Sequence, residues 1–296
     1  MKRKGAFCAV AGLSLAVAVC CAAGASAPAS AATVPAGSAY VALGDSYTSA
    51  PLVEPVSASA PLECAQSQAN YPHLTAKALG LSLTDVSCGG ATVSDMTESQ
   101  YPGVDPQFDA LSSSDAVVSL GIGGNDDNTF ITAVAGCGAL DALDPEAVFS
   151  GAGGAPCESA FGDYFADNIA SDAPNIGAAL QKIHTLAPNA RVFVVGYPDI
   201  LPQSGNCWSA IPLTTGDVAY LNSVEHDLNA MLQSEASANG ATYVDTYDPT
   251  IGHDLCQSES VRYVEPLVPS TDAISVHPNA AGEAAMASLL EAAVNS

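Results

Sequence analysis

The stretch Tyr40-Val41-Ala42-Leu43, followed directly by Gly44-Asp45-Ser46, decides how this sequence folds. A compact apolar run of this kind is typical of a strand that is covered on both faces, as in a parallel sheet. Four more such runs lie further along the chain, and two of them also end in glycine-rich turns. These further strands are predicted at 83–87, 115–120, 191–197 and 241–245.

Helical patterns separate these strands. Apolar residues recur at helical spacing over 175–186 and 217–238, and an alanine-rich helix over 279–294 closes the chain. Strands that alternate with helices predict βαβ units, and therefore a three-layer α/β/α sandwich around a central, mainly parallel five-stranded sheet. We find no second domain and no internal repeat, so residues 33–296 are predicted to form a single domain. Residues 136–160, rich in glycine and alanine, are interpreted as a long surface loop or lid.

The N-terminal segment has the pattern of a secretory signal peptide. Three basic residues at positions 2–4 precede an apolar run over 6–23, and small residues follow over 26–32. We predict that residues 1–32 are removed by cleavage after Ala31 or Ala32, so that the protein is secreted and extracellular. The alternative is a retained membrane anchor, and a lipid attached at Cys20 is a weaker one. Beyond this segment no comparable apolar run occurs, and no stable membrane insertion is expected.

Composition restricts the class of partner. The chain has 296 residues, with 31 acidic against 7 basic residues and a formal net charge of −24. Nucleic acid is therefore excluded as a partner, because its phosphates would be repelled rather than neutralised. Hydrophobic residues make up 48% of the chain, which is enough for a sizeable core. We expect an acidic monomer whose carboxylates mostly form a solvated surface.

Six cysteines remain once the leader is set aside. An even number in an exported protein indicates disulfides, although six cysteines allow fifteen pairings that a sequence does not distinguish. No two of them form a Cys-x-x-Cys pair, so a zinc site is not favoured. Pairing of nearest neighbours is the simplest prediction, and it gives Cys64–Cys88, Cys137–Cys157 and Cys207–Cys256.

Small polar groups follow three of the predicted strands. Ser46, Gly90 and Asn125 come just after the strand ends, and the carboxyl ends of parallel strands form the ligand crevice of an open α/β sheet. A hydroxyl there can be a nucleophile, while a backbone N–H and an amide can stabilise an oxyanion. The nucleophile needs a base, and histidine suits this task near neutral pH. His277, in a loop before the last helix, is the first candidate, and His253 is the second.

Neighbouring carboxylates have a structural interpretation. Asp45 is predicted to tie down its turn by accepting backbone N–H bonds rather than to act as an acid. Asp126 and Asp127 are interpreted as turn and capping residues rather than metal ligands. We therefore expect no metal and no cofactor.

Four blocks of the sequence match one family in order. Residues 44–47 (Gly-Asp-Ser-Tyr) resemble the GDSL block, and Gly90 resembles the glycine of the second block. Residues 121–126 resemble the G-x-N-D block, and residues 277–282 the last block. Together they resemble the SGNH (GDSL-type) hydrolases, in particular the secreted, disulfide-bonded esterases and lipases of filamentous actinobacteria.

The resemblance runs from about Ala39 to the C-terminus and implies a flavodoxin-like SGNH hydrolase fold. It implies Ser46 as nucleophile, an oxyanion hole built from the Ser46 N–H, the Gly90 N–H and the Asn125 amide, and His277 as base. The activity it implies is cleavage of a small ester or a lipid through a Ser–His acyl-enzyme mechanism. The alternatives are a polysaccharide deacetylase or a phospholipase on the same fold, or a non-catalytic exported binding protein.

The sequence departs from the family at one position. The family usually has an aspartate three residues before the histidine, whereas this chain has Ile274, which cannot accept the imidazole N–H. The resemblance implies that a main-chain carbonyl orients His277 instead, either that of Ile274 or that of Ser275, with Asp272 as the alternative. Without a carboxylate partner the pKa of His277 is expected to be lower, and activity is expected to rise through about pH 6–7.

Overall fold

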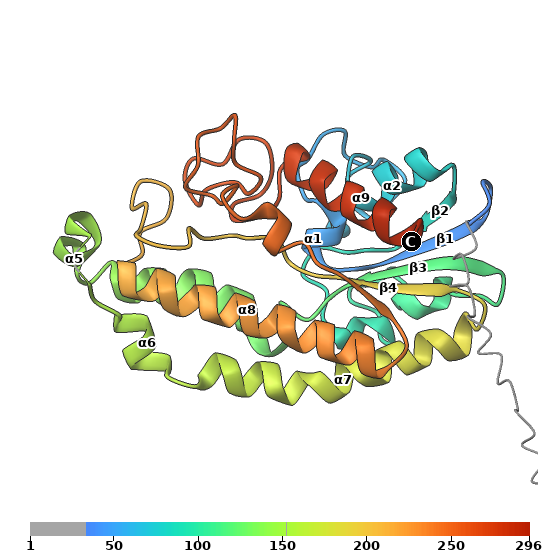
Figure 1. The fold of residues 1–296 in the computed structure, drawn as a ribbon, viewed down its shortest axis with the longest axis horizontal. Coiled ribbons are helices and arrows are strands. Elements are labelled where there is room, and N and C mark those ends of the chain that lie inside the picture. The colour runs from blue at the N-terminus through green and yellow to red at the C-terminus, as the bar shows by residue number, and fades with distance from the viewer. Residues whose placement is uncertain (1–33, 152) are drawn as a thin grey trace, which may run out of the picture. The chain divides into compact units, whose positions relative to one another are not determined.

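In the computed structural model, which describes residues 34–151 and 153–296, parallel strands form one sheet in the order β2-β1-β3-β4-β5 (Figure 1). All pairings between neighbouring strands are parallel, as the sequence predicts. The predicted leader 1–32 and its cleavage site lie outside the described residues. The strands are β1 (Ala39–Gly44), β2 (Ser82–Asp85), β3 (Asp115–Gly121), β4 (Arg191–Val195) and β5 (Thr242–Val244).

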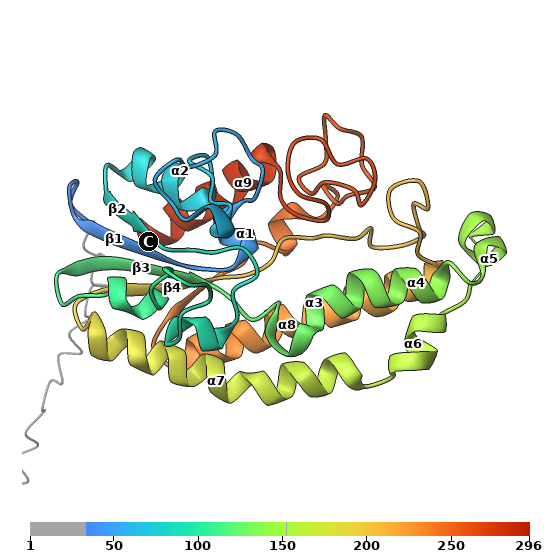
Figure 2. The ribbon, with the colours of Figure 1, turned by 180° about the vertical axis from the view of Figure 1, so that it is seen from behind.

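Both faces of the central strands β1, β3 and β4 are buried, which explains their apolar runs, whereas the edge strand β2 is partly exposed. Along β1, Val41 and Leu43 belong to one hydrophobic cluster, while Tyr40 and Ala42 belong to another on the opposite face. The first cluster packs against helices α7 (Tyr164–Leu186) and α8 (Thr215–Ala238), and the second packs against α2 (Tyr71–Leu79) and α9 (Ala280–Val294). Figures 1 and 2 show the two helix pairs on opposite sides of the sheet. This is the predicted three-layer sandwich.

Helix boundaries follow local capping chemistry. Thr214 caps α8 by accepting the Asp217 N–H, and Asn279 caps α9 by accepting two backbone N–H groups. The predicted helix over 175–186 is only the second half of α7, because Pro174 lies inside that helix rather than before it. The remaining α-helices of the described residues are α1 (Ser46–Ser49), α3 (Thr129–Ile131), α4 (Cys137–Asp141), α5 (Pro145–Ser150) and α6 (Pro156–Phe161).

The interpretation of residues 136–160 as a long loop is wrong. The segment contains α4, α5 and α6, and a short π-helix over Thr132–Gly136 joins α4 to α3. Proline at the first turns of α5 and α6 begins these helices, because its φ angle already suits a helix and its missing N–H has no acceptor there. Gly138, Ala139, Ala147 and Ala160 lie inside these helices, so a high content of glycine and alanine does not indicate a loop here.

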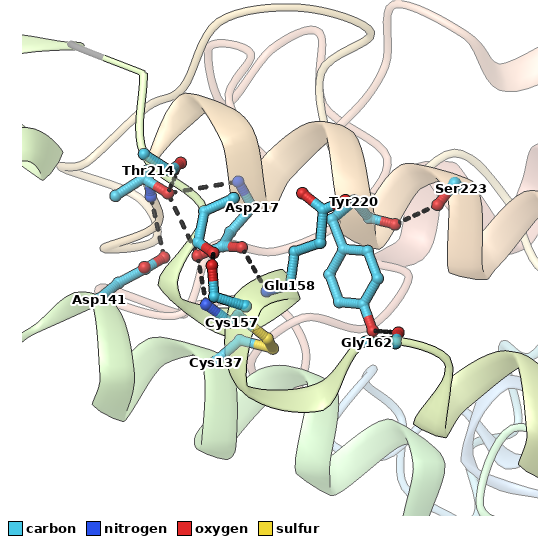
Figure 3. Close-up of a disulfide and its surroundings, with 12 residues drawn as sticks. Cys137, Asp141, Cys157, Glu158, Gly162, Thr214, Asp217, Tyr220 and Ser223 are labelled. Carbon is cyan, nitrogen blue, oxygen red and sulfur yellow. Dashed lines mark hydrogen bonds between the residues drawn. A yellow bond between two sulfur atoms is a disulfide. The ribbon is translucent and has the colours of Figure 1, made fainter.

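Two acidic side chains fasten this segment to the start of α8 (Figure 3). Asp217 of α8 accepts the N–H groups of Cys157 and Glu158, and so caps α6 from a neighbouring helix. Asp141 of α4 accepts the Thr214 N–H at 2.9 Å. Burial, together with the nearby Asp217, raises the pKa of Asp141 to about 7. The segment is thus held by buried polar contacts as well as by its disulfide.

The three nearest-neighbour disulfides are all present, joining Cys64 to Cys88, Cys137 to Cys157, and Cys207 to Cys256. Among the described residues, no helix combines the length and the apolar character that a bilayer span requires.

Candidate active site

Ser46 stands at the point where β1 turns into α1. Gly44 ends the strand with a φ of 157°, and a Cβ there would lie 2.6 Å from the Gly121 carbonyl oxygen of the neighbouring strand. Asp45 then caps α1 by accepting the Tyr47 N–H, so that Ser46 is the first helical residue. The N–H of a first helical residue has no intrahelical acceptor, which leaves the Ser46 N–H available to a ligand.

His277 reaches Ser46 from the far end of the chain. Its Nε2 lies 2.7 Å from Ser46 Oγ, and its Nδ1 lies 2.9 Å from the Ser275 carbonyl oxygen. A carbonyl only accepts, so Nδ1 carries the proton and donates it. Nε2 of the neutral ring is therefore the acceptor for the serine hydroxyl.

The other groups considered for orienting the imidazole do not contact it. The Ile274 carbonyl, the other main-chain candidate, makes no hydrogen bond to the His277 ring in the described residues, and residue 274 is 41% exposed. Asp272 is also exposed. His253, the second candidate for the base, stacks on Tyr263 and bonds the Val261 carbonyl through its own Nδ1. Of the groups considered for orienting the imidazole, only the Ser275 carbonyl forms a hydrogen bond with it.

A rigid turn holds His277, and no local pattern in the sequence indicates it. Val276 has a φ of 61°, a left-handed conformation that is costly for a β-branched residue. The Tyr47 hydroxyl donates to the Val276 carbonyl at 2.6 Å, across 229 positions of sequence. Glu265 donates its N–H to the His277 carbonyl and accepts the Val276 N–H. The backbone on either side of the imidazole is therefore held by residues distant in sequence.

Glu265 is itself fixed. Its side chain is fully buried and receives two hydrogen bonds from the Arg262 guanidinium and one from Asn279. These donors lower the pKa of the Glu265 carboxyl despite its burial, so this group stays ionised. This largely buried ion pair supports the turn that carries His277.

The imidazole of His277 lies in an apolar setting. Its ring is 4.7 Å from the Tyr47 ring and 5.3 Å from the Phe130 ring, and the residue is 6% exposed. Burial lowers the pKa of His277 to about 4, while the bond to Ser275 acts weakly in the opposite direction. The low pKa agrees with the expected direction, and burial is its main cause.

From the sequence alone, activity is expected to rise through about pH 6–7. Because the pKa of His277 is about 4, we expect this rise at a lower pH. The base must be neutral to accept a proton, so activity is lost as the pH falls through about 4. We expect kcat/KM for a short-chain ester to stay level from about pH 7 to pH 5 and to fall tenfold per pH unit below about pH 4. A limb centred near pH 6.5 would mean that His277 keeps the pKa of a solvated imidazole.

Two further donors lie at the ends of β2 and β3. Gly90 has a φ of 78°, and in the described part of the chain no hydrogen bond uses its N–H as the donor. Asn125 donates from Nδ2 to the Ala91 carbonyl at 3.0 Å, which brings its amide next to Gly90 and fixes its orientation. The second hydrogen of that amide remains for another acceptor. These donors, with the Ser46 N–H, are the groups predicted to form an oxyanion hole.

Replacing Asn125 by alanine is expected to lower kcat by about 100- to 1,000-fold, because the site then lacks one donor to the developing oxyanion. KM should change far less, since the neutral carbonyl of the bound ester is a weaker acceptor than the oxyanion. Steady-state kinetics on a soluble ester checks this. A raised KM with kcat unchanged would instead indicate that Asn125 binds the substrate and the transition state equally.

Asp45 has a structural role beside the nucleophile. Its carboxylate accepts the Tyr197 hydroxyl at 2.6 Å as well as the Tyr47 N–H, and Tyr197 in turn accepts the Gly124 N–H. Burial raises the pKa of Asp45 to about 7. Asp45 thereby links the turn after β1 to those after β3 and β4.

In the described residues, no three metal-ligating side chains come together.

An apolar cavity opens beside these groups. Phe130 packs on His277, Val276 precedes it, and Gly124 precedes Asn125, and all three line the cavity. It contains about 650 Å³ of empty space, part of which is open to solvent. The remaining lining residues are Thr129, Ala133, Val134, Tyr197, Ile200, Leu201, Ile211, Leu213, Leu221, Val224, Glu225 and Leu228.

A serine hydroxyl on a neutral imidazole, free N–H donors and an apolar cavity are the parts of a serine acyl hydrolase. Comparisons with known proteins agree. The model of the GDSL-like lipase/acylhydrolase family matches residues 42–285. The chain is 44% identical over 229 residues to Lipase 2 of Streptomyces coelicolor, a match that covers 76% of each chain.

Solved structures agree as well. Phospholipase A1 from Streptomyces albidoflavus superposes with a TM-score of 0.68 at 27% identity, covering 88% of this chain and all of that one. The extracellular lipase from Streptomyces rimosus superposes with a TM-score of 0.67 at 26% identity, covering 87% of this chain and all of that one. The chain belongs to the GDSL-like lipase/acylhydrolase family, and it is a carboxylic ester hydrolase.

Proposed function

We propose that this lipase/esterase acts as an extracellular enzyme and cleaves lipid esters through an acyl-enzyme formed on Ser46. The observation that carries the proposal is the continuous hydrogen-bond chain from Ser46 Oγ through the His277 ring to the Ser275 carbonyl. The three disulfides, and the extracellular relative, support an exported location. We expect the enzyme to work as a monomer without a cofactor.

Acylation begins with proton transfer. His277 Nε2 takes the Ser46 proton as Oγ attacks the ester carbonyl carbon, and the carbonyl oxygen becomes an oxyanion. The Ser46 N–H, the Gly90 N–H and the Asn125 amide stabilise this oxyanion. When the tetrahedral intermediate collapses, the bond to the alcohol oxygen breaks, and the imidazolium gives its proton to that oxygen. The alcohol then leaves.

Deacylation repeats the sequence with water. Neutral His277 takes a proton from a water molecule that attacks the acyl-enzyme, and then returns it to Ser46 Oγ as the carboxylic acid departs. Throughout, the Ser275 carbonyl accepts the Nδ1 proton and so fixes which nitrogen faces the serine. A carbonyl stabilises the imidazolium less than a carboxylate does, which is consistent with the low pKa of His277.

The acyl chain is proposed to occupy the apolar cavity beside His277. Its walls are almost entirely hydrocarbon, and each buried methylene contributes about 0.8 kcal/mol. Lengthening the chain should therefore raise kcat/KM by about fourfold per methylene until the cavity is filled. The cavity gives no comparable support to an acetyl group on a polysaccharide.

A panel of esters tests this proposal. We expect kcat/KM to increase from acetate through butyrate to octanoate esters of one alcohol. The panel also includes phosphatidylcholine and acetylated xylan. Fast release of fatty acid from the phospholipid would extend the proposal to phospholipids. Hydrolysis confined to acetate esters and acetylated xylan would contradict it and favour a deacetylase.

A further inference from the structure

Glu225 interrupts the apolar wall of the cavity. It lies on the face of α8 that also carries Leu221, Val224 and Leu228, and all four residues line the same cavity. Glu225 is only 8% exposed, and it is the one carboxyl group in the lining. Carboxyl groups are rarely buried unless they are paired, so its presence here requires a reason.

The hydrogen bonds of Glu225 are incomplete. Oε2 accepts the Ile200 N–H at a long distance of 3.4 Å, while Oε1 is buried and has no partner within the part of the chain that the structure describes. Some buried carboxylates of this protein are well supplied: Asp217 accepts backbone N–H groups of α6, and Glu265 receives an arginine. Other buried carboxyl groups also have one oxygen without a partner in the described residues, but Glu225 alone among them lines the cavity; these others are Asp141, Asp172 and Glu283. A buried polar atom without a partner is costly, and it points to a group that arrives from outside.

The acidic neighbour Asp199 does not supply that group. Its charge acts on Glu225, but its own oxygens accept hydrogen bonds from the Gln203 side chain and the Gly252 N–H. Burial and the charge of Asp199 raise the pKa of Glu225 well above its usual range. A protonated carboxyl both donates and accepts, so it is matched to a hydroxyl group, which does the same.

We propose that Glu225 binds a hydroxyl group on the acyl chain, so that esters of hydroxylated fatty acids are preferred substrates of this enzyme. The inference rests on the proposed acyl hydrolysis at Ser46 and adds the chemistry of the acyl group. In a cavity without Glu225, the hydroxyl would lose its hydrogen bonds to water on entry and the substrate would be rejected. With Glu225 present, a hydroxyl placed where it reaches Oε1 exchanges its hydrogen bonds to water for hydrogen bonds to the carboxyl group.

The test compares methyl octanoate with the isomeric methyl hydroxyoctanoates. For wild-type enzyme we expect one isomer, or two adjacent ones, to be hydrolysed at least as fast as octanoate in kcat/KM. The other isomers should be slower by about tenfold or more. In Glu225→Leu, the favoured isomer should lose about tenfold or more relative to octanoate, because its hydroxyl then has no partner. Glu225→Gln, which still donates and accepts, should retain most of the preference.

Asp227→Leu is the matched control, because it removes a carboxylate from the same helix at an exposed position outside the cavity. It should leave the isomer profile unchanged. If wild-type enzyme hydrolyses every hydroxylated isomer at least tenfold more slowly than octanoate, Glu225 holds only a buried water molecule and the inference is wrong. If octanoate itself is not hydrolysed, the proposed function fails instead, so the two failures are distinguishable. The wild-type profile decides the question even if Glu225→Leu does not fold.

Discussion

Replacing Ser46 by alanine is expected to lower kcat/KM for a soluble ester by at least about 10,000-fold, because no acyl-enzyme can then form. The hydroxyl is 2.7 Å from His277 Nε2, and no other hydroxyl of the described residues bonds that nitrogen. Release of p-nitrophenol from the butyrate ester measures the loss. Wild-type hydrolysis by the variant would exclude Ser46 as nucleophile.

Ser49→Ala is the matched control for this experiment. Ser49 lies in the same short helix, is fully buried, and its hydroxyl has no hydrogen-bond partner within the described residues. Removing that hydroxyl should leave kcat/KM within about twofold of wild type and should not lower the melting temperature. A large loss of activity in this control would attribute the Ser46 result to disruption of α1.

Replacing His277 by alanine should have an effect of similar size, about 10,000-fold in kcat, because the serine hydroxyl then has no base. Residues that act as a unit are strongly non-additive, so the Ser46→Ala/His277→Ala double variant should be no worse than either single variant. Steady-state kinetics of the three proteins checks this. The His253→Ala variant should retain activity, because the His253 imidazole contacts Tyr263 and the Val261 carbonyl rather than Ser46. Losses that multiply in the double variant would show that the two residues act independently.

The sequence predicts the sheet well because its signals are local. Each predicted strand overlaps an observed one. The central strands β1, β3 and β4 are largely apolar because both of their faces are buried, whereas the edge strands β2 and β5 are partly exposed. The placement of Ser46 and Asn125 follows from the same reasoning, because parallel strands bring their carboxyl ends to one edge. The sequence therefore predicts which strands carry the active-site residues.

Features that depend on long-range contacts could not be inferred in the same way. Residues 136–160 resemble a loop in composition, and their short helices persist because Asp217, in a distant part of the chain, caps α6. A proline usually lies at the start of a helix rather than in its interior, yet α7 continues through Pro174. The turn that holds His277 depends on a hydrogen bond from Tyr47. In the sequence, Glu225 resembles a surface residue of a helix, whereas in the structure it is buried. Tertiary contacts decide each of these cases.

The central claim is that neutral His277 activates Ser46, and covalent trapping tests it most directly. A p-nitrophenyl alkylphosphonate should inactivate the enzyme with one equivalent of bound phosphonate, and peptide mapping by mass spectrometry should locate the adduct on Ser46. Labelling should be absent in Ser46→Ala and slower by about 1,000-fold or more in His277→Ala. An adduct on a different residue that accompanies full loss of activity, or unchanged labelling of His277→Ala, would contradict the account.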